Sequence, residues 1–381
     1  MSKQTFQILK ELPITFAQAQ CVLYKNEILI CGGYERKTCY SYHTLKNKYK
    51  FICNYPDDVR LEAHCVVKLI NNNNKDSNQI ILLSLGGISH IKKHALVMKY
   101  VSVWSNILDI SNKSSELNNY NQWIPFTCND NRPIIFGGKY DSYCGARAVV
   151  GGRNNNLLFI TYYYDNISVF NLNTFKFNKH CTLPTNNCIG HHCFVSKSEN
   201  EQGQEIMKTN EEKNKQNQML LFCMGTGLSI EYNEDNNTFQ FYQLPVCDDI
   251  APLYHYAYVR VNNIILFFGG WNDSKILVSK SVHMYLIREN KWMKFRNTLP
   301  RPLYDCIATL NEEDNHIHII GGKDYKKALV STHVKTKVRV WDPLQLSKNE
   351  IKCIIKHWTQ ILKIKLGWID DFDKIIIKYS K

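Results

Sequence analysis

The sequence predicts an all-β fold, a six-bladed β-propeller in which each blade is a sheet of four antiparallel strands. Two observations carry this prediction. An apolar run that ends in Gly-Gly recurs along the 381 residues, and a pattern of aromatic, Asn and aromatic residues follows it. One such sheet cannot bury both of its faces, so the repeated units must pack around a common axis.

The apolar runs mark the second strand of each unit. Intact copies occupy residues 28–33, 80–87, 264–270 and 316–322. Two weaker copies, at residues 157–163 and 219–227, lie between them. The copies follow one another at about the length of one four-stranded blade. Each run is preceded by a short segment of small residues, such as 64–67 or 305–308, which predicts the first strand.

The third and fourth strands of a unit are expected on either side of an Asn turn. Asn47, Asn173, Asn237 and Asn290 each precede an aromatic residue by two positions. Asn favours such turns because its short side chain tolerates a left-handed backbone. A Pro then ends the fourth strand, because Pro cannot donate to a β-ladder.

In these motifs the chain resembles the kelch-repeat family. The resemblance covers about residues 5–341 and is strongest in units 1, 2, 5 and 6. It implies a kelch-type propeller over residues 1–343, usually a protein-binding module. The six units are expected near residues 14–56, 61–127, 146–184, 190–245, 254–300 and 304–341.

The N-terminus is expected to close the ring. Residues 5–13 resemble the fourth strands of other units, whereas the third strand of the last unit, expected at 333–341, has no fourth strand after it. The N-terminal strand therefore completes blade 6 and removes a free sheet edge. Residues 134–138, which also end in Gly-Gly, are interpreted as an elaborated connection between blades 2 and 3.

Residues 344–381 are predicted to form a short C-terminal α-helical hairpin. Apolar residues at helical spacing would share one face, and we expect this face to mediate interactions: Ile351, Ile355, Trp358 and Leu362. Three roles stay open for it: packing on the propeller, binding a partner or self-association, and lying on an anionic membrane surface. About +8 of the net charge of +13 falls in the last sixth of the chain.

Loop lengths select one face of the propeller as the recognition surface. With the four strands of a blade lettered a to d in chain order, the a–b and c–d loops lie on one face and the b–c and d–a loops on the other. The long insertions at 71–79, 104–120 and 197–218 all fall in a–b or c–d loops, and therefore on one face. The opposite face has short b–c and d–a loops, and one of these d–a loops contains His255. Aromatic and charged residues typical of binding hot spots occupy those loops: Tyr34, Arg36, Arg60, Tyr254, Trp271, Asp273, Arg301, Tyr304, Lys323 and Tyr325.

The motifs favour a non-catalytic protein-interaction scaffold with an unidentified protein partner. The spacing of Cys188, His191 and Cys193 suggests zinc. The repeat, however, places His192 and Cys193 on a first strand, so we expect no metal and no cofactor. Alternatives are a propeller enzyme, either a metal-dependent oxidase or a sugar-active enzyme, and a binder of anionic surfaces through the basic tail. No hydrolase, phosphate-loop or metalloprotease motif occurs in the sequence, which disfavours the enzyme.

The composition also indicates the compartment and which partners are unfavoured. No apolar run reaches 18 residues, so no membrane span is expected. The N-terminal residues lack a secretory apolar stretch, so we expect a cytoplasmic protein whose 14 cysteines are free thiols. Outside the tail the charges are nearly balanced, which makes nucleic acid an unfavoured partner.

Overall fold

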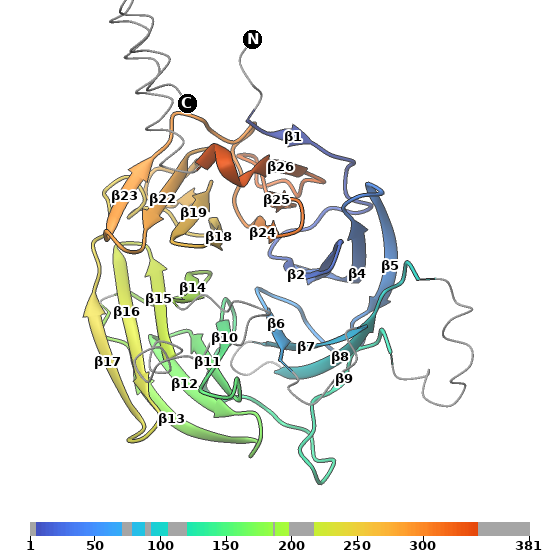
Figure 1. Ribbon diagram of the computed structural model, residues 1–381, viewed down its shortest axis with the longest axis vertical. Helices are drawn as coiled ribbons and strands as arrows, with labels where there is room; N and C mark the ends of the chain where they lie inside the picture. The colour runs from blue at the N-terminus through green and yellow to red at the C-terminus, as the bar shows by residue number, and fades with distance from the viewer. Residues whose placement is uncertain are drawn as a thin grey trace, which may run out of the picture. The chain divides into compact units, whose positions relative to one another are not determined.

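The computed structural model describes residues 5–70, 78–87, 93–105, 120–185, 187–197 and 217–341. Within these residues, six four-stranded antiparallel sheets are arranged as blades around one axis (Figure 1). The prediction of a six-bladed, all-β propeller is confirmed. The chain divides into two compact units, Met1–Lys335 and Thr336–Lys381, and the first of them contains the propeller.

In blades 1 to 5 the four main strands follow one another from the axis outward in the order of the chain. Blade 1 contains β2 (Gln20–Tyr24), β3 (Glu27–Gly33), β4 (Arg36–His43) and β5 (Lys48–Asn54). Blade 2 contains β6 (Cys65–Leu69), β7 (Gln79–Gly86), β8 (His94–Val101) and β9 (Ile124–Pro125). Blade 3 contains β10 (Arg147–Gly151), β11 (Leu157–Tyr162), β12 (Asn166–Asn171) and β13 (Lys176–Thr182).

The second half of the ring follows the same plan. Blade 4 contains β14 (Cys193–Ser196), β15 (Gln218–Cys223), β16 (Thr226–Asn233) and β17 (Thr238–Gln243). Blade 5 contains β18 (Ala257–Val261), β19 (Ile264–Phe268), β22 (Val282–Leu286) and β23 (Lys291–Lys294). Its b–c loop carries a small hairpin of β20 (Trp271–Asn272) and β21 (Leu277–Val278).

Blade 6 joins the two ends of the propeller. It contains β24 (Ile307–Asn311), β25 (His316–Ile320) and β26 (His333–Lys337), and its outer strand is β1 (Gln7–Ile8). Gln7 pairs with Lys335 and Ile8 with Val334, so the predicted closure by the N-terminal strand is confirmed (Figure 1). The third strand is shorter than the predicted 333–341, because the chain turns into a 3-10 helix at Val338–Trp341.

The Gly-Gly pair of blade 5 lies against the loop that leads to the next blade. A Cβ on Gly269 would lie 2.1 Å from the Leu303 carbonyl oxygen, in the loop that leads to the next blade. The amide of Gly270 donates to that same oxygen at 2.8 Å. The φ angles of both glycines are positive, +68° and +112°. Glycine is therefore needed here both for its backbone conformation and for the missing side chain.

The predicted Asn turns form in three blades. In each, a tyrosine hydroxyl on the third strand donates to the Asn side-chain oxygen five residues later; in blade 5, Tyr285 reaches Asn290 at 2.8 Å. Asn47, Asn237 and Asn290 all have φ near +50°. Blade 3 departs from the prediction. Phe175 rather than Asn173 has the positive φ of +55°, because the turn lies five residues after the aromatic and Phe170 has no hydroxyl to bind an Asn.

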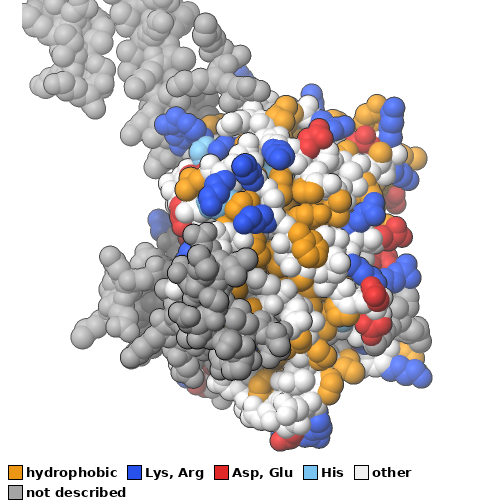
Figure 2. All heavy atoms as spheres, turned by 90° about the vertical axis from the view of Figure 1, so that its right-hand side faces the viewer, with side chains coloured by type: hydrophobic (Ala, Val, Ile, Leu, Met, Phe, Trp, Pro, Cys, Tyr) orange, Lys and Arg blue, Asp and Glu red, His pale blue; other side chains and the backbone are white. Residues whose placement is uncertain are grey.

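The hydrophobic core is divided among the spaces between adjacent blades. Blades 1 and 2 share one cluster, which includes Leu29, Tyr55, Leu82 and Trp123. Corresponding clusters lie between the later blades. On the side of the molecule shown in Figure 2, exposed hydrophobic side chains lie among Lys, Arg and acidic side chains.

Some predictions fall on residues that the structure does not describe. The C-terminal hairpin over 344–381 lies outside the described residues, as do most of the three long insertions. In the part that is described, the insertions interrupt the a–b loops of blades 2 and 4 and the c–d loop of blade 2, as predicted. The connection over 126–146 contains no strand in the described structure, consistent with its interpretation as a link between blades.

Candidate functional site

Six equivalent residues, one from each blade, surround the axis on the short-loop face. Each lies just before the first strand of its blade and has a φ between +47° and +72°. The side chains differ from blade to blade: Gln18, Ala63, Gly145, His191, His255 and Asp305. We call these residues the axial ring.

Backbone hydrogen bonds connect the axial ring from blade to blade. The amide of Gln18 donates to the carbonyl of Asp305 at 2.8 Å, and the amide of Asp305 donates to the carbonyl of His255 at 2.9 Å. The amide of His191 donates to the carbonyl of Gly145 at 3.0 Å. Because these amides reach back to the preceding blade, closure of the propeller itself positions the residues that they join.

Three consecutive members of the ring bring metal-binding side chains together. One ligand atom from each of His191, His255 and Asp305 lies within 4.8 Å of the other two. Nδ1 of His255 is hydrogen-bonded to Oδ1 of Asp305, and the two imidazole rings stack with their centroids 3.7 Å apart. Gly145 leaves room for this stack, since a Cβ there would lie 2.9 Å from Cδ2 of His191.

The side chain of Asp305 is buried and is held by hydrogen bonds and an ion pair. Its carboxylate is 2% exposed, accepts hydrogen bonds from Nε2 of Gln18 at 3.3 Å, and lies 3.2 Å from Nζ of Lys323. Burial alone would raise the pKa of Asp305, but the hydrogen bond from His255 and the nearby positive charges lower it to about 2. Asp305 is therefore ionised at neutral pH.

His191 is held in its neutral form. Burial is the main cause that lowers the pKa of His191 well below its usual value, and the charge of His255 adds to the effect. Arg147, at the start of β10, lowers the pKa of His191 further. The axial ring thus offers neutral imidazole beside an ionised carboxylate.

Predicted residues from blades 1, 5 and 6 meet beside the axial ring. Nζ of Lys323 lies 4.7 Å from the ring centroid of Tyr34 and 5.8 Å from that of Tyr304. Trp271 packs on Tyr304 with centroids 5.3 Å apart, and Tyr254 packs against the same cluster. We call these five residues the aromatic surface. Trp271 and Tyr304 are each 8% exposed, so they mainly support the surface.

The other predicted residues surround the aromatic surface. The first residue of β4, Arg36, is exposed at the same face, and loops of that face expose Arg60, Arg301, Asp273 and Tyr325. The guanidinium group of Arg60 lies 3.6 Å from a carboxylate oxygen of Glu62, and that of Arg301 lies 3.7 Å from one of Asp324. Asp273 accepts a hydrogen bond from the indole of Trp271 at 3.3 Å. Ion pairs at such exposure contribute little to stability, so these charges remain available to a ligand.

Sequence reasoning missed the grouping of the axial ring. Proximity in the sequence associated His191 with Cys188 and Cys193, but Cys193 is buried on β14 and Cys188 is exposed; in the described structure neither belongs to the group around His191. Asp305 was assigned to a first strand. A fixed offset before each first strand is the signal that would have aligned the six positions.

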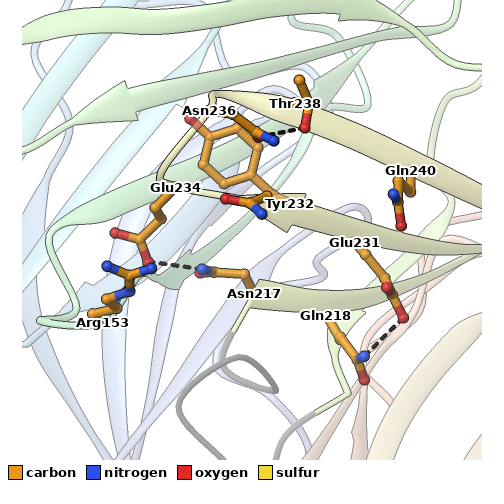
Figure 3. A pocket seen from close by; sticks show the side chains of 10 residues that line it. Arg153, Asn217, Gln218, Glu231, Tyr232, Glu234, Asn236, Thr238 and Gln240 are labelled. Carbon is orange, nitrogen blue, oxygen red and sulfur yellow. Dashed lines mark hydrogen bonds between the residues drawn. The ribbon is translucent and has the colours of Figure 1, made fainter. Parts of the chain in front are cut away.

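A separate hollow of about 180 Å³ lies on the long-loop face of blade 4 (Figure 3). Its polar lining is paired largely within itself. Nδ2 of Asn217 donates to Glu234 at 2.7 Å, and Nε2 of Gln218 donates to Glu231 at 2.7 Å. Arg153 extends from the neighbouring blade and pairs with Asp235 at 2.7 Å. Because these groups satisfy one another, we give the axial ring more weight as a functional site.

Comparison with known proteins shows the fold alone. No protein-family model matches the chain, and no curated protein matches it. The solved structure of a protein called YjhT is similar with a TM-score of 0.57 and 12% sequence identity, covering 86% of this chain and 96% of that chain. No helix among the described residues is long and apolar enough to cross a membrane. The comparisons therefore identify a propeller and assign no activity.

Proposed function

We propose that this chain is a kelch-type propeller and a non-catalytic interaction module that binds an acidic segment of another protein across its short-loop face. One observation carries the proposal: loops of three blades place Nζ of Lys323 over the rings of both Tyr34 and Tyr304, and Arg36 and Arg301 are exposed on the same face. Residues distant in sequence thus form one surface of aromatic and cationic groups.

The physical chemistry of this surface suits an acidic partner. Arg presents a planar set of donors that bind carboxylates in pairs, and such charge-assisted hydrogen bonds are stronger than neutral ones. Tyrosine and tryptophan add contact area at a low cost in conformational entropy. The aromatic surface is already packed before any partner arrives, so little ordering is required on binding.

Binding of immobilised acidic and basic peptides tests the proposal. We expect the purified chain to bind acidic peptides more tightly at low salt, since exposed charges are screened by salt. The double variant Arg36→Glu, Arg301→Glu should lose about tenfold or more in affinity. Arg288→Glu, in the turn between β22 and β23 on the opposite face, is the matched control. Equal binding by all three proteins, or no preference for acidic peptides, contradicts the proposal.

We also propose, from the sequence pattern, that residues 344–381 form an amphipathic helical hairpin with Ile351, Ile355, Trp358 and Leu362 on one face. The double variant Ile355→Asp, Trp358→Asp tests what covers this face. Packing on the propeller predicts destabilisation by several kcal/mol. A partner or self-association predicts unchanged stability with loss of binding or of the oligomer. If stability, oligomeric state and binding all persist, the helical face has no such role.

A further inference from the structure

The axial ring supports a second binding activity, independent of the proposed protein partner. We propose that His191, His255 and Asp305 bind one divalent transition-metal ion, with Zn²⁺ the best fit, at the axis of the short-loop face. The three ligand atoms come from loops of blades 4, 5 and 6 and already lie within 4.8 Å of one another.

The spacing of the donors is close to that of a tetrahedral site. Bonds of about 2.0 Å to zinc place the ligand atoms of a tetrahedron about 3.3 Å apart. The two distances to Oδ1 of Asp305 bracket this value. Nδ1 of His191 lies 4.0 Å away, and Nδ1 of His255 is at hydrogen-bonding distance. Metal binding requires the two stacked imidazole rings to rotate so that their lone pairs converge, and the ion takes the place of the proton between His255 and Asp305, which is released to solvent.

The scaffold holds the donors before any ion binds. The ring residues have a left-handed backbone, which His and Asp adopt more readily than most residues. Around Asp305, Gln18 donates to the carboxylate at 3.3 Å, and the Gln18 side-chain oxygen accepts from the amide of Ala63 at 3.1 Å. Outer hydrogen bonds of this kind orient metal ligands and raise the affinity of metal sites.

The donor set selects the class of ion. Two imidazole nitrogens and one carboxylate oxygen suit Zn²⁺ and related transition ions, whereas Ca²⁺ and Mg²⁺ prefer oxygen ligands throughout. Three protein ligands leave one position of a tetrahedron for water or for a group of a bound molecule.

Replacement of Lys323 should change the metal affinity in the opposite direction to replacement of a ligand. The Lys323 ammonium group lies 3.2 Å from Oδ2 of Asp305 and would repel a bound cation. Replacing it by an uncharged side chain of similar length should therefore strengthen metal binding, although the same replacement weakens the aromatic surface. This sign separates a metal site from a cluster that serves only to hold the loops together.

The test is a Zn²⁺ titration of chelator-treated full-length protein in competition with a chromophoric chelator. We expect one ion per chain and tighter binding in Lys323→Met. Binding should weaken by about 100-fold or more in His255→Ala and Asp305→Asn, because outer hydrogen-bond partners of metal ligands alone contribute about 10- to 100-fold. Cys188→Ser and His180→Ala, at exposed sites outside the ring, should bind as the parent does. The melting temperature of each chelator-treated variant verifies that it is folded.

Co²⁺ substitution provides a second readout. Visible absorption of a four-coordinate ion without a sulfur charge-transfer band supports nitrogen and oxygen ligands. The proposal is overturned if the parent binds no Zn²⁺, if folded ring variants bind it as tightly as the parent, or if a sulfur band appears and disappears with Cys188→Ser. Peptide binding by the same proteins reports separately on the protein-partner proposal.

Discussion

Two buried histidines of blade 2 should make the protein sensitive to mild acid. Nε2 of His64 donates to the Cys31 carbonyl at 2.9 Å, and Nε2 of His94 lies 3.1 Å from the hydroxyl of Ser84. Within the described structure, Nδ1 of each is buried without a partner. Burial, with repulsion from His94, lowers the pKa of His64 to about 3, and burial lowers the pKa of His94 to about 4. Both are therefore neutral in the folded protein.

The sign and size of the effect follow from proton binding. In the unfolded chain a histidine has a pKa of about 6.5, so below that pH the unfolded state binds protons that the folded state does not. Stability is complete above about pH 6.5 and falls by about 1.4 kcal/mol per pH unit for each histidine as the pH decreases. At about pH 5 the loss is about 2 kcal/mol each, or about 4 kcal/mol for the pair. That is a large part of a usual domain stability of about 5–15 kcal/mol.

Urea unfolding at several pH values between about 7.5 and 5 measures this effect. The double variant His64→Gln, His94→Gln should be less stable at neutral pH, yet lose about 4 kcal/mol less than the parent on acidification. Other histidines whose pKa values are lowered by burial contribute to both proteins and cancel in the comparison, among them His191, His192, His283, His318 and His333. His180→Gln on the exposed strand β13 is the control. If the double variant loses as much stability as the parent, the two histidines are not held neutral in the folded protein.

Three further predictions concern the architecture. Gly269→Ala should destabilise the protein by about 2–5 kcal/mol in urea unfolding, because a positive φ and a carbonyl 2.1 Å away both oppose a Cβ, whereas Gly225→Ala, with open space around it, should be close to neutral. Deleting residues 1–13 removes the outer strand of blade 6 and the buried side chains that follow it, so we expect a loss of about 5 kcal/mol or more; an unchanged melting curve would refute the closure. Replacing residues 198–216 with a short Gly-Ser linker should change stability by no more than about 1 kcal/mol, and a severe folding defect would show that the insertion packs as structure.

Local chemistry explains why the blade pattern could be predicted. Gly-Gly was informative because the left-handed backbone at Gly32, Gly269 and Gly321 leaves few alternatives to glycine. The prediction was wrong in blade 3 because it relied on the residue type, Asn173. The left-handed residue is instead the one that lies five positions after Phe170, which is Phe175. Tertiary pairing tolerated an aromatic residue in a left-handed turn because the strand ladder on both sides held it in place.

The candidate site could be predicted only in part, because its positions share geometry and not residue type. Loop lengths alone placed Lys323, Tyr34 and Tyr304 on one face, and their mutual contact required the curvature of the ring. The sequence grouped His191 with nearby cysteines and assigned Asp305 to a first strand, so neither was connected with the other. Their relation to the axis depends on backbone hydrogen bonds that cross from blade to blade.

The axial ring is the place where the six blades share a backbone conformation but not a residue type. The fold requires the same left-handed turn six times, and at Ala63 and Gly145 it is filled by small residues. Gly adopts that backbone at the lowest cost, and Asn, Asp and His adopt it more readily than other residues, so the turn alone does not specify an imidazole or a carboxylate at any copy. Blades 4, 5 and 6 instead hold two half-buried imidazoles that stack on each other and a buried carboxylate that is hydrogen-bonded to one of them. Closing the turn does not need these side chains, and binding an ion at the axis does.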